Sequence, residues 1–141
     1  MAECVFCKIV KGDLPCFKVY EDERVLAFED INPISKGHTL IIPKRHAENL
    51  WEISGEDLAA IHLVSQKVVH AFRKVLKPSG LAALQLNGQG ANQMVAHYHL
   101  HLVPRIPGTL PLPMTNWDLH PGNRGTLAET AAKISAALRS S

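Results

Sequence analysis

The chain has 141 residues, of which 46% are hydrophobic and 20% are charged, and its formal net charge is +2. This balance predicts one globular domain over residues 1–141, and the small charge argues against a nucleic-acid polymer as partner. No apolar run approaches the roughly 20 residues that cross a membrane, and no signal peptide is visible, so we expect no membrane partner. Three cysteines do not suit a disulfide framework, which favours a reducing, cytoplasmic location.

The first motif along the chain is Cys4-Val5-Phe6-Cys7. Such a pair can be a redox pair, two unreactive cysteines or half of a zinc site. A redox pair normally follows a strand, and no strand can precede this one, so half of a zinc site is the favoured interpretation. The other two ligands would come from the eight histidines. Cys16 is interpreted as structural.

Three short strands are expected next. Apolar and β-branched residues predict strands over 17–20 and 25–29, with a polar turn between them. Asn32-Pro33 then initiates a turn, and Gly37 leads into the run 38–43, which is the clearest strand signal before residue 80.

A long helix is predicted to begin at Ser54, a good N-cap with Glu56 and Asp57 in the turn that follows. Apolar residues then recur at spacings of three and four, which directs one helix face to the core. They are Leu58, Ile61, Val64, Val68, Phe72 and Leu76. Pro78-Ser79-Gly80 ends the helix.

A strand over 81–86 is expected to lead into the loop 87–93, which is rich in glycine and amide side chains. Small residues let backbone N–H groups approach an anion, although most such loops are plain turns. We interpret this loop as functional because it delivers the chain directly to a row of histidines.

His97, His99 and His101 alternate with apolar residues over 97–103, which predicts a strand that stops at Pro104. The three imidazoles would share one strand face, and neutral imidazoles are costly to bury without partners, so the row is a functional candidate. Two chemistries remain open. The imidazoles could hold a metal, or one could attack phosphorus while a neighbour manages protons.

The last part of the chain divides in two. Residues 104–124 are rich in proline and glycine and are expected to be irregular, and 126–138 read as a helix. Strands early and late with one long helix between them predict an α+β domain with a mainly antiparallel sheet.

The pattern His-φ-His-φ-His-φ-φ, with φ apolar, resembles the signature of the histidine triad (HIT) family. Residues 4–10, 27–33, 37–46 and 87–105 match that family in order and spacing. The resemblance is closest to small single-domain members that hydrolyse nucleoside phosphoramidates and related nucleotides. It implies a HIT-like α+β domain with a mainly antiparallel sheet of about five strands, one long helix and a C-terminal helix.

The resemblance also implies catalytic roles. The family's middle histidine attacks the α-phosphorus, so His99 is the expected nucleophile and hydrolysis would pass through a nucleotidyl-histidine intermediate. His101 would bond the phosphate or handle the leaving group's proton. His38 resembles the family's fourth histidine, which approaches from the neighbouring strand. This chemistry needs no catalytic cofactor.

Nucleotide contacts follow from the same resemblance. Asp30 resembles the carboxylate that accepts both ribose hydroxyls, although capping a turn is its ordinary alternative. The side chains expected to wall the purine base, which are also candidates for ordinary core, are Phe6, Ile9, Phe28, Ile31 and Leu40.

The phosphate and leaving-group side is expected to involve Asn87 and Gln93. Two positions depart from the family pattern. Asn92 stands where the family usually has glycine, and Met94 stands where some members have a serine that bonds the phosphate or the leaving group. Both leave hydrolysis expected but affect rate and leaving-group preference.

Some bacterial members resemble this chain in carrying structural zinc between an N-terminal cysteine pair and two histidines. The matching positions are Cys4, Cys7, His46 and His97. A Cys₂His₂ set is typical of a closed, structural site. The family is commonly homodimeric, with the long helix and the strands around the triad in the interface.

The leading hypothesis is therefore a hydrolase of purine nucleoside phosphoramidates or related nucleotides. A dinucleoside polyphosphate hydrolase or nucleotidyl transferase is the near alternative. A non-catalytic nucleotide-binding scaffold and a metalloenzyme that uses all three histidines are the more distant ones.

Overall fold

The computed structural model describes residues 4–109, 111–112 and 119–140. The chain falls into two compact units, Met1–Thr109 and Leu110–Ser141. The second unit contains α3 (Arg124–Arg139), whose N-cap Asn123 accepts the backbone N–H of Thr126. Within the described residues, every helix is too short or too polar to cross a membrane.

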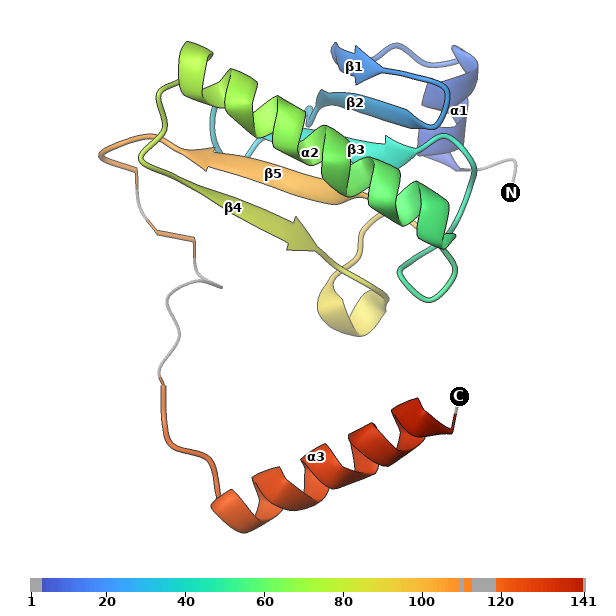
Figure 1. Cartoon of the computed structure of the whole chain (residues 1–141). Helices are drawn as coiled ribbons and strands as arrows, with labels where there is room; N and C mark the ends of the chain where they lie inside the picture. Colours follow the sequence, from blue (N-terminus) through green and yellow to red (C-terminus); the bar gives the residue numbers. More distant parts are fainter. Residues whose placement is uncertain (1–3, 110, 113–118, 141) are drawn as a thin grey trace. The chain divides into compact units, whose positions relative to one another are not determined.

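The first unit is built on a five-stranded sheet (Figure 1). Its strands are β1 (Lys18–Glu21), β2 (Val25–Glu29), β3 (Thr39–Pro43), β4 (Gly80–Gln85) and β5 (Leu100–Arg105). They lie in the order β1-β2-β3-β5-β4, and every neighbouring pair is antiparallel. The α+β class and the mainly antiparallel sheet are therefore confirmed.

One face of this sheet is covered by α2 (Gly55–Val75), which lies obliquely over the strands in Figure 1. The predicted N-cap is confirmed, since Ser54 Oγ accepts the N–H of Asp57. The buried helix residues Ile61, Val64, Val68 and Phe72 meet Val25, Ala27, Ile41, Tyr98, Leu100 and Leu102 in one core cluster. Burial of this periodic apolar face fixes the helix on the sheet.

The opposite face of the sheet carries a second, smaller core. Phe6 of α1 (Val5–Lys11) packs there against Leu26, Phe28, Leu40 and Ile42. Residues of β2 alternate between the two cores, as side chains of a strand must. The short helix α1 was not predicted. Its boundary signals are Cys4, the N-cap, and Gly12, the C-cap at φ 87°.

The histidine row lies only partly on a strand, which corrects the sequence interpretation. β5 begins at Leu100, so His97 and His99 stand in the segment before it, and the strand continues through Pro104 to Arg105. Pro104 is tolerated because β3 pairs with β5 only up to Leu102, which leaves β4 as the neighbour at that point. The irregular region predicted for 104–124 begins later than expected, and residues 110 and 113–118 lie outside the described ones.

Gly37 positions the start of β3 beside the site. It has φ 90°, a conformation that residues with a Cβ rarely adopt, and a Cβ there would run into the side chain of Leu76. His38, the next residue, is buried, with 2% of its surface exposed.

Candidate active site and metal centre

His99 is held in one defined tautomer. Its Nδ1 lies 2.7 Å from the backbone carbonyl oxygen of His97, and a carbonyl can only accept, so Nδ1 carries the hydrogen. Burial lowers the pKa of His99, so the ring is neutral at neutral pH. Nε2 therefore bears a lone pair, which is the form that a nucleophilic imidazole requires.

His101 of β5 is hydrogen-bonded to His38, the residue immediately before β3. His38 Nε2 lies 2.9 Å from His101 Nδ1, and the ring centroids are 5.2 Å apart. His38 Nδ1 accepts the backbone N–H of Ile34 at 3.0 Å, so the hydrogen of a neutral His38 is on Nε2. His101 Nδ1 must then accept, and its own hydrogen is on Nε2. Burial, with His99 and His38 nearby, lowers the pKa of His101 to about 4.

Asp30 stands at the edge of this group. Its Oδ1 accepts the backbone N–H of Asn32 at 2.8 Å, which is the turn-capping role that sequence reasoning kept as an alternative. Its Oδ2 lies 3.5 Å from His38 Nε2. The side chain is partly exposed, so the carboxylate keeps room for a ligand.

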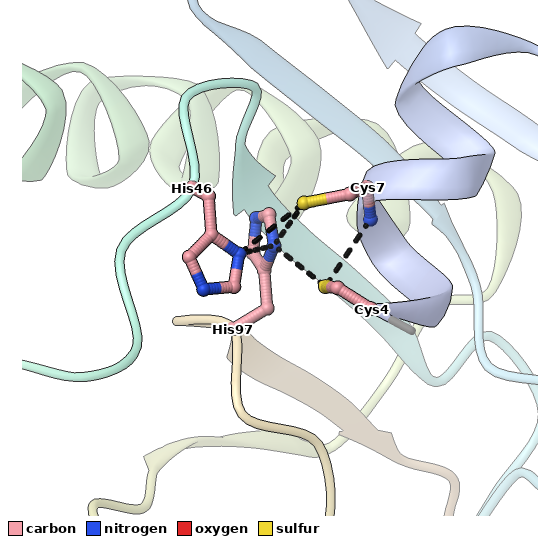
Figure 2. A group of neighbouring side chains, drawn as sticks. All are labelled: Cys4, Cys7, His46 and His97. Atoms are coloured by element: carbon pink, nitrogen blue, oxygen red, sulfur yellow. Dashed lines mark hydrogen bonds between the residues drawn. The ribbon is translucent and has the colours of Figure 1, made fainter. Parts of the chain in front are cut away.

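The four predicted zinc ligands converge (Figure 2). Cys4 and Cys7 come from the start of α1, His46 from the segment after β3, and His97 from the segment before β5. His46 Nδ1 lies 3.2 Å from Cys7 Sγ and 3.2 Å from His97 Nδ1. His97 Nδ1 lies 3.4 Å from Cys4 Sγ and 3.6 Å from Cys7 Sγ. A zinc tetrahedron with its usual bond lengths has edges of about 3.3–3.8 Å, so the residues fit the ion.

The chemistry of this donor set also suits a cation. His97 Nε2 lies 2.8 Å from the carbonyl oxygen of Pro43 and must donate to it, so the Nδ1 lone pair is the atom turned toward the cysteines. Burial, followed by the neighbouring Cys4 side chain, raises the pKa of the Cys7 thiol. A bound cation is the partner that would let both thiols ionise. A cavity of about 390 Å³ lies beside this group, and Cys4 and His46 are among the residues that line it.

Asp30, His38 and His101 form a second group with ligand atoms close together, but they suit a metal poorly. The lone pair of His38 Nδ1 is taken by the N–H of Ile34, so Nε2 must keep its hydrogen unless the ring becomes an anion. A ring in that state cannot ligate through Nε2. The hydrogen bonds therefore favour side-chain hydrogen bonding among Asp30, His38 and His101 over metal binding.

Phe6 contacts one histidine of each site. Its ring meets those of His97 and His99 edge-on, with centroids 5.8 Å and 5.2 Å apart. Of the side chains expected to wall the base, Phe6, Phe28 and Leu40 are buried together with Ile9 packed against them, while Ile31 is exposed.

The loop amides are engaged within the protein. Asn87 Oδ1 accepts the N–H of Leu50 at 2.7 Å, and its amide also bonds Gln85. Gln93 Oε1 accepts the N–H of Gly88, and its Nε2 donates to the carbonyls of Glu48 and Val95. These bonds hold the loop itself. The expected phosphate contacts of Asn87 and Gln93 stay predictions.

The two departures from the family pattern are also located. Asn92 has φ 67° and caps the short 3₁₀ turn η1 (Gln89–Ala91). Asparagine is among the few residues besides glycine that adopt this left-handed conformation readily, so Asn92 suits its position. Met94 is exposed.

Sequence reasoning missed the main-chain groups of the site. The carbonyls of His97 and Pro43 and the N–H of Ile34 determine which nitrogen of each histidine carries its hydrogen. Backbone atoms are the same in every residue, so no side-chain pattern could have identified them.

The sequence and the fold were compared with known proteins. The HIT domain family model matches residues 11–108. Protein hit of Bacillus subtilis is 50% identical over 102 residues, which are 72% of this chain and 70% of that protein. The adenosine 5'-monophosphoramidase of Schizosaccharomyces pombe is 48% identical over 102 residues, 72% and 74% of the two chains.

Solved structures agree. The crystal structure of a HIT family member from Bacillus subtilis superposes with a TM-score of 0.85 at 40% identity, covering 95% of this chain and 96% of that one. A Zn-bound histidine triad family protein from Mycobacterium smegmatis gives a TM-score of 0.73 at 36% identity, covering 96% and 98%. The five-stranded antiparallel fold, the histidine row and these matches agree, and the chain belongs to the HIT domain family.

Proposed function

We propose that this protein hydrolyses a purine nucleoside phosphoramidate or a related nucleotide by attack of His99 on the α-phosphorus. A bond forms between His99 Nε2 and phosphorus as the bond to the leaving group breaks. Water then releases the nucleotide from the nucleotidyl-histidine. Splitting one substitution into two steps replaces a difficult reaction with two easier ones.

The observation that carries this proposal is the bond from His99 Nδ1 to the carbonyl of His97. It leaves the Nε2 lone pair free in a ring whose pKa burial lowers. His101, hydrogen-bonded to His38, retains a hydrogen on Nε2 and is the group that would donate to the phosphate or the leaving group.

The nucleoside would occupy the side of the sheet covered by α1. Phe6, Phe28 and Leu40, buried in the second core, would back the base beside His99. Asp30 would accept the two ribose hydroxyls, because a carboxylate suits a vicinal diol and its Oδ2 is not used by the Asn32 turn.

Zinc would be held by Cys4, Cys7, His46 and His97 and would serve structure. When bound, it would neutralise the two thiolates and fasten α1 to the segment that carries the triad. Catalysis would then involve His99 and His101, whose contacts are separate from the cysteines.

A homodimer and a cytoplasmic location complete the proposal. β4 lies at an edge of the sheet and carries no charged residue, which is the kind of edge that a second copy covers. Cys4, Cys7 and Cys16 are all free thiols, consistent with a reducing compartment.

The test is a steady-state comparison of adenosine phosphoramidate with a dinucleoside polyphosphate. Higher kcat/KM for the phosphoramidate supports the proposal, and the reverse order supports the polyphosphate hydrolase instead. Binding of nucleotide without turnover of either substrate would support the non-catalytic nucleotide-binding scaffold. A chelator should lower stability before it lowers kcat, whereas a metalloenzyme would lose kcat at once.

A further inference from the structure

The single hydrogen of His38 has one hydrogen-bond partner, and a second candidate acceptor lies nearby. Its Nδ1 is occupied by the backbone N–H of Ile34, so its single hydrogen is on Nε2. Burial lowers the pKa of His38, so the ring does not gain a second hydrogen at neutral pH. From Nε2, His101 Nδ1 is 2.9 Å away and Asp30 Oδ2 is 3.5 Å away.

The two acceptors have different consequences. When the hydrogen lies on the His101 side, His101 Nδ1 accepts and the hydrogen of that ring stays on Nε2. When the carboxylate of Asp30 attracts the hydrogen, His101 loses the bond that fixes its tautomer and its ring plane. Buried hydrogen bonds of this kind are worth enough to shift a tautomer balance.

The oxygen of Asp30 that faces His38 is also the one open to a ligand. Its Oδ1 is already bonded to the N–H of Asn32, and the partly exposed Oδ2 is the oxygen that faces His38. A ligand that donates to Oδ2 offsets part of the carboxylate's charge and so weakens its attraction for the His38 hydrogen. A ribose diol is such a ligand.

We propose that His38 is a positioning residue whose single N–H, shared between Asp30 and His101, couples ribose binding at Asp30 to the orientation of His101. This rests on the proposed function and adds to it: the 2′,3′-diol is recognised in kcat as well as in binding. A ribonucleotide substrate directs His38 fully to His101, and a 2′,3′-dideoxy substrate leaves Asp30 competing for the same hydrogen.

The kinetic test compares ribose and 2′,3′-dideoxy adenosine phosphoramidates. In the wild type, kcat should fall by roughly two- to tenfold for the dideoxy substrate, the size of one hydrogen bond, in addition to the rise in KM. His38→Gln offers an amide with two hydrogens at about the position of Nε2, so it can serve Asp30 and His101 together. In that variant the kcat ratio should return to near one while KM discrimination persists.

His38→Asn is the matched variant, because its shorter side chain can still accept the Ile34 N–H but does not reach His101. It should lose kcat on both substrates equally. A wild-type kcat ratio near one, or the same ratio in wild type and His38→Gln, would overturn the coupling. A protein that turns over neither substrate would instead overturn the proposed function.

A second measurement needs neither turnover nor a variant. Two-bond ¹H–¹⁵N correlation on ¹⁵N-histidine protein reports which nitrogen of His101 is protonated. With adenosine 5'-monophosphate bound, His101 should be entirely the Nε2–H tautomer, and with the 2′,3′-dideoxy analogue the Nδ1 signal should shift toward a mixture. Identical His101 signals with the two nucleotides would overturn the proposal.

Discussion

The carbonyl oxygen of His97 accepts the Nδ1–H of His99 at 2.7 Å, while the His97 side chain turns its own Nδ1 toward Cys4 and Cys7. One residue thus serves two sites, with its main chain at the candidate nucleophile and its side chain at the candidate zinc ligands. The tautomer of His99 therefore depends on the backbone around His97. Two further hydrogen bonds, to Pro43 and to Ala47, hold this segment in place.

Replacing His99 with alanine should reduce turnover to below roughly 1% of wild type, because alanine has no nitrogen that could attack the phosphorus. Nucleotide binding should persist. Rates on adenosine phosphoramidate and calorimetric binding of adenosine 5'-monophosphate check the two parts. A variant that keeps more than a few per cent of the activity would remove the nucleophile assignment.

Asp30→Ala should weaken binding of a ribonucleotide by roughly 1–3 kcal/mol, the scale of hydrogen bonds to a charged group. The loss should shrink for the 2′,3′-dideoxy nucleotide, which has no hydroxyls to donate. Calorimetry with both ligands on both proteins gives the comparison. Equal losses for the two nucleotides would show that Asp30 does not read the ribose.

About one zinc per chain is expected in protein made with zinc available, since the four ligand atoms all lie within 4.8 Å of one another. The double variant Cys4→Ser, Cys7→Ser should lose the metal and melt at a lower temperature, because metal binding is coupled to folding. Much of the turnover per folded molecule should remain, since the bonds of His97 to Pro43 and His99 do not need the thiols.

The matched control for that variant is Cys16→Ser. Cys16 is a free thiol packed on the second core and stands apart from the ligand group. The Cys16→Ser variant should keep the metal. Zinc content unchanged in the double variant, or far below one per chain in the wild type, would remove the site.

Stability should fall as the pH drops from about 6.5 toward 4. Burial lowers the pKa of His101 from 6.5 to about 4, so the unfolded chain binds more protons than the folded one in this window. The free energy of unfolding therefore rises with pH through the window and levels above it. Urea unfolding at about pH 7 and about pH 5 measures the effect.

Two variants separate this effect from metal loss. In the Cys4→Ser, Cys7→Ser protein, the free energy of unfolding should still rise with pH. In His101→Asn, that rise should be smaller than in the wild type. A free energy of unfolding that is higher at pH 5 than at pH 7 would contradict the assigned shift.

Much of this architecture follows from local patterns in the sequence. Ser54 caps α2, the spacing of Ile61, Val64 and Val68 gives its buried face, and the run before Lys44 is a buried strand. These features depend on neighbours a few residues away, which a sequence displays directly.

Other features depend on distant contacts and were missed or misplaced. β5 begins at Leu100 because its pairing ends there, opposite Ile41 of β3 and Gln85 of β4, and alternation alone cannot reveal where the pairing with distant strands stops. The helix α1 is short, and its buried Phe6 is stabilised by strands that come later in the chain. The expected single domain over 1–141, with α3 included, stays a prediction.

The covalent nucleotidyl-His99 intermediate is the most direct test of the central claim. Protein mixed with adenosine phosphoramidate and quenched within a turnover should gain the mass of one adenylyl group on the peptide that carries His99. His99→Ala should gain none under the same conditions. An adenylyl group on His101 or His97, or rapid turnover with no adduct on His99 at any quench time, would contradict the account.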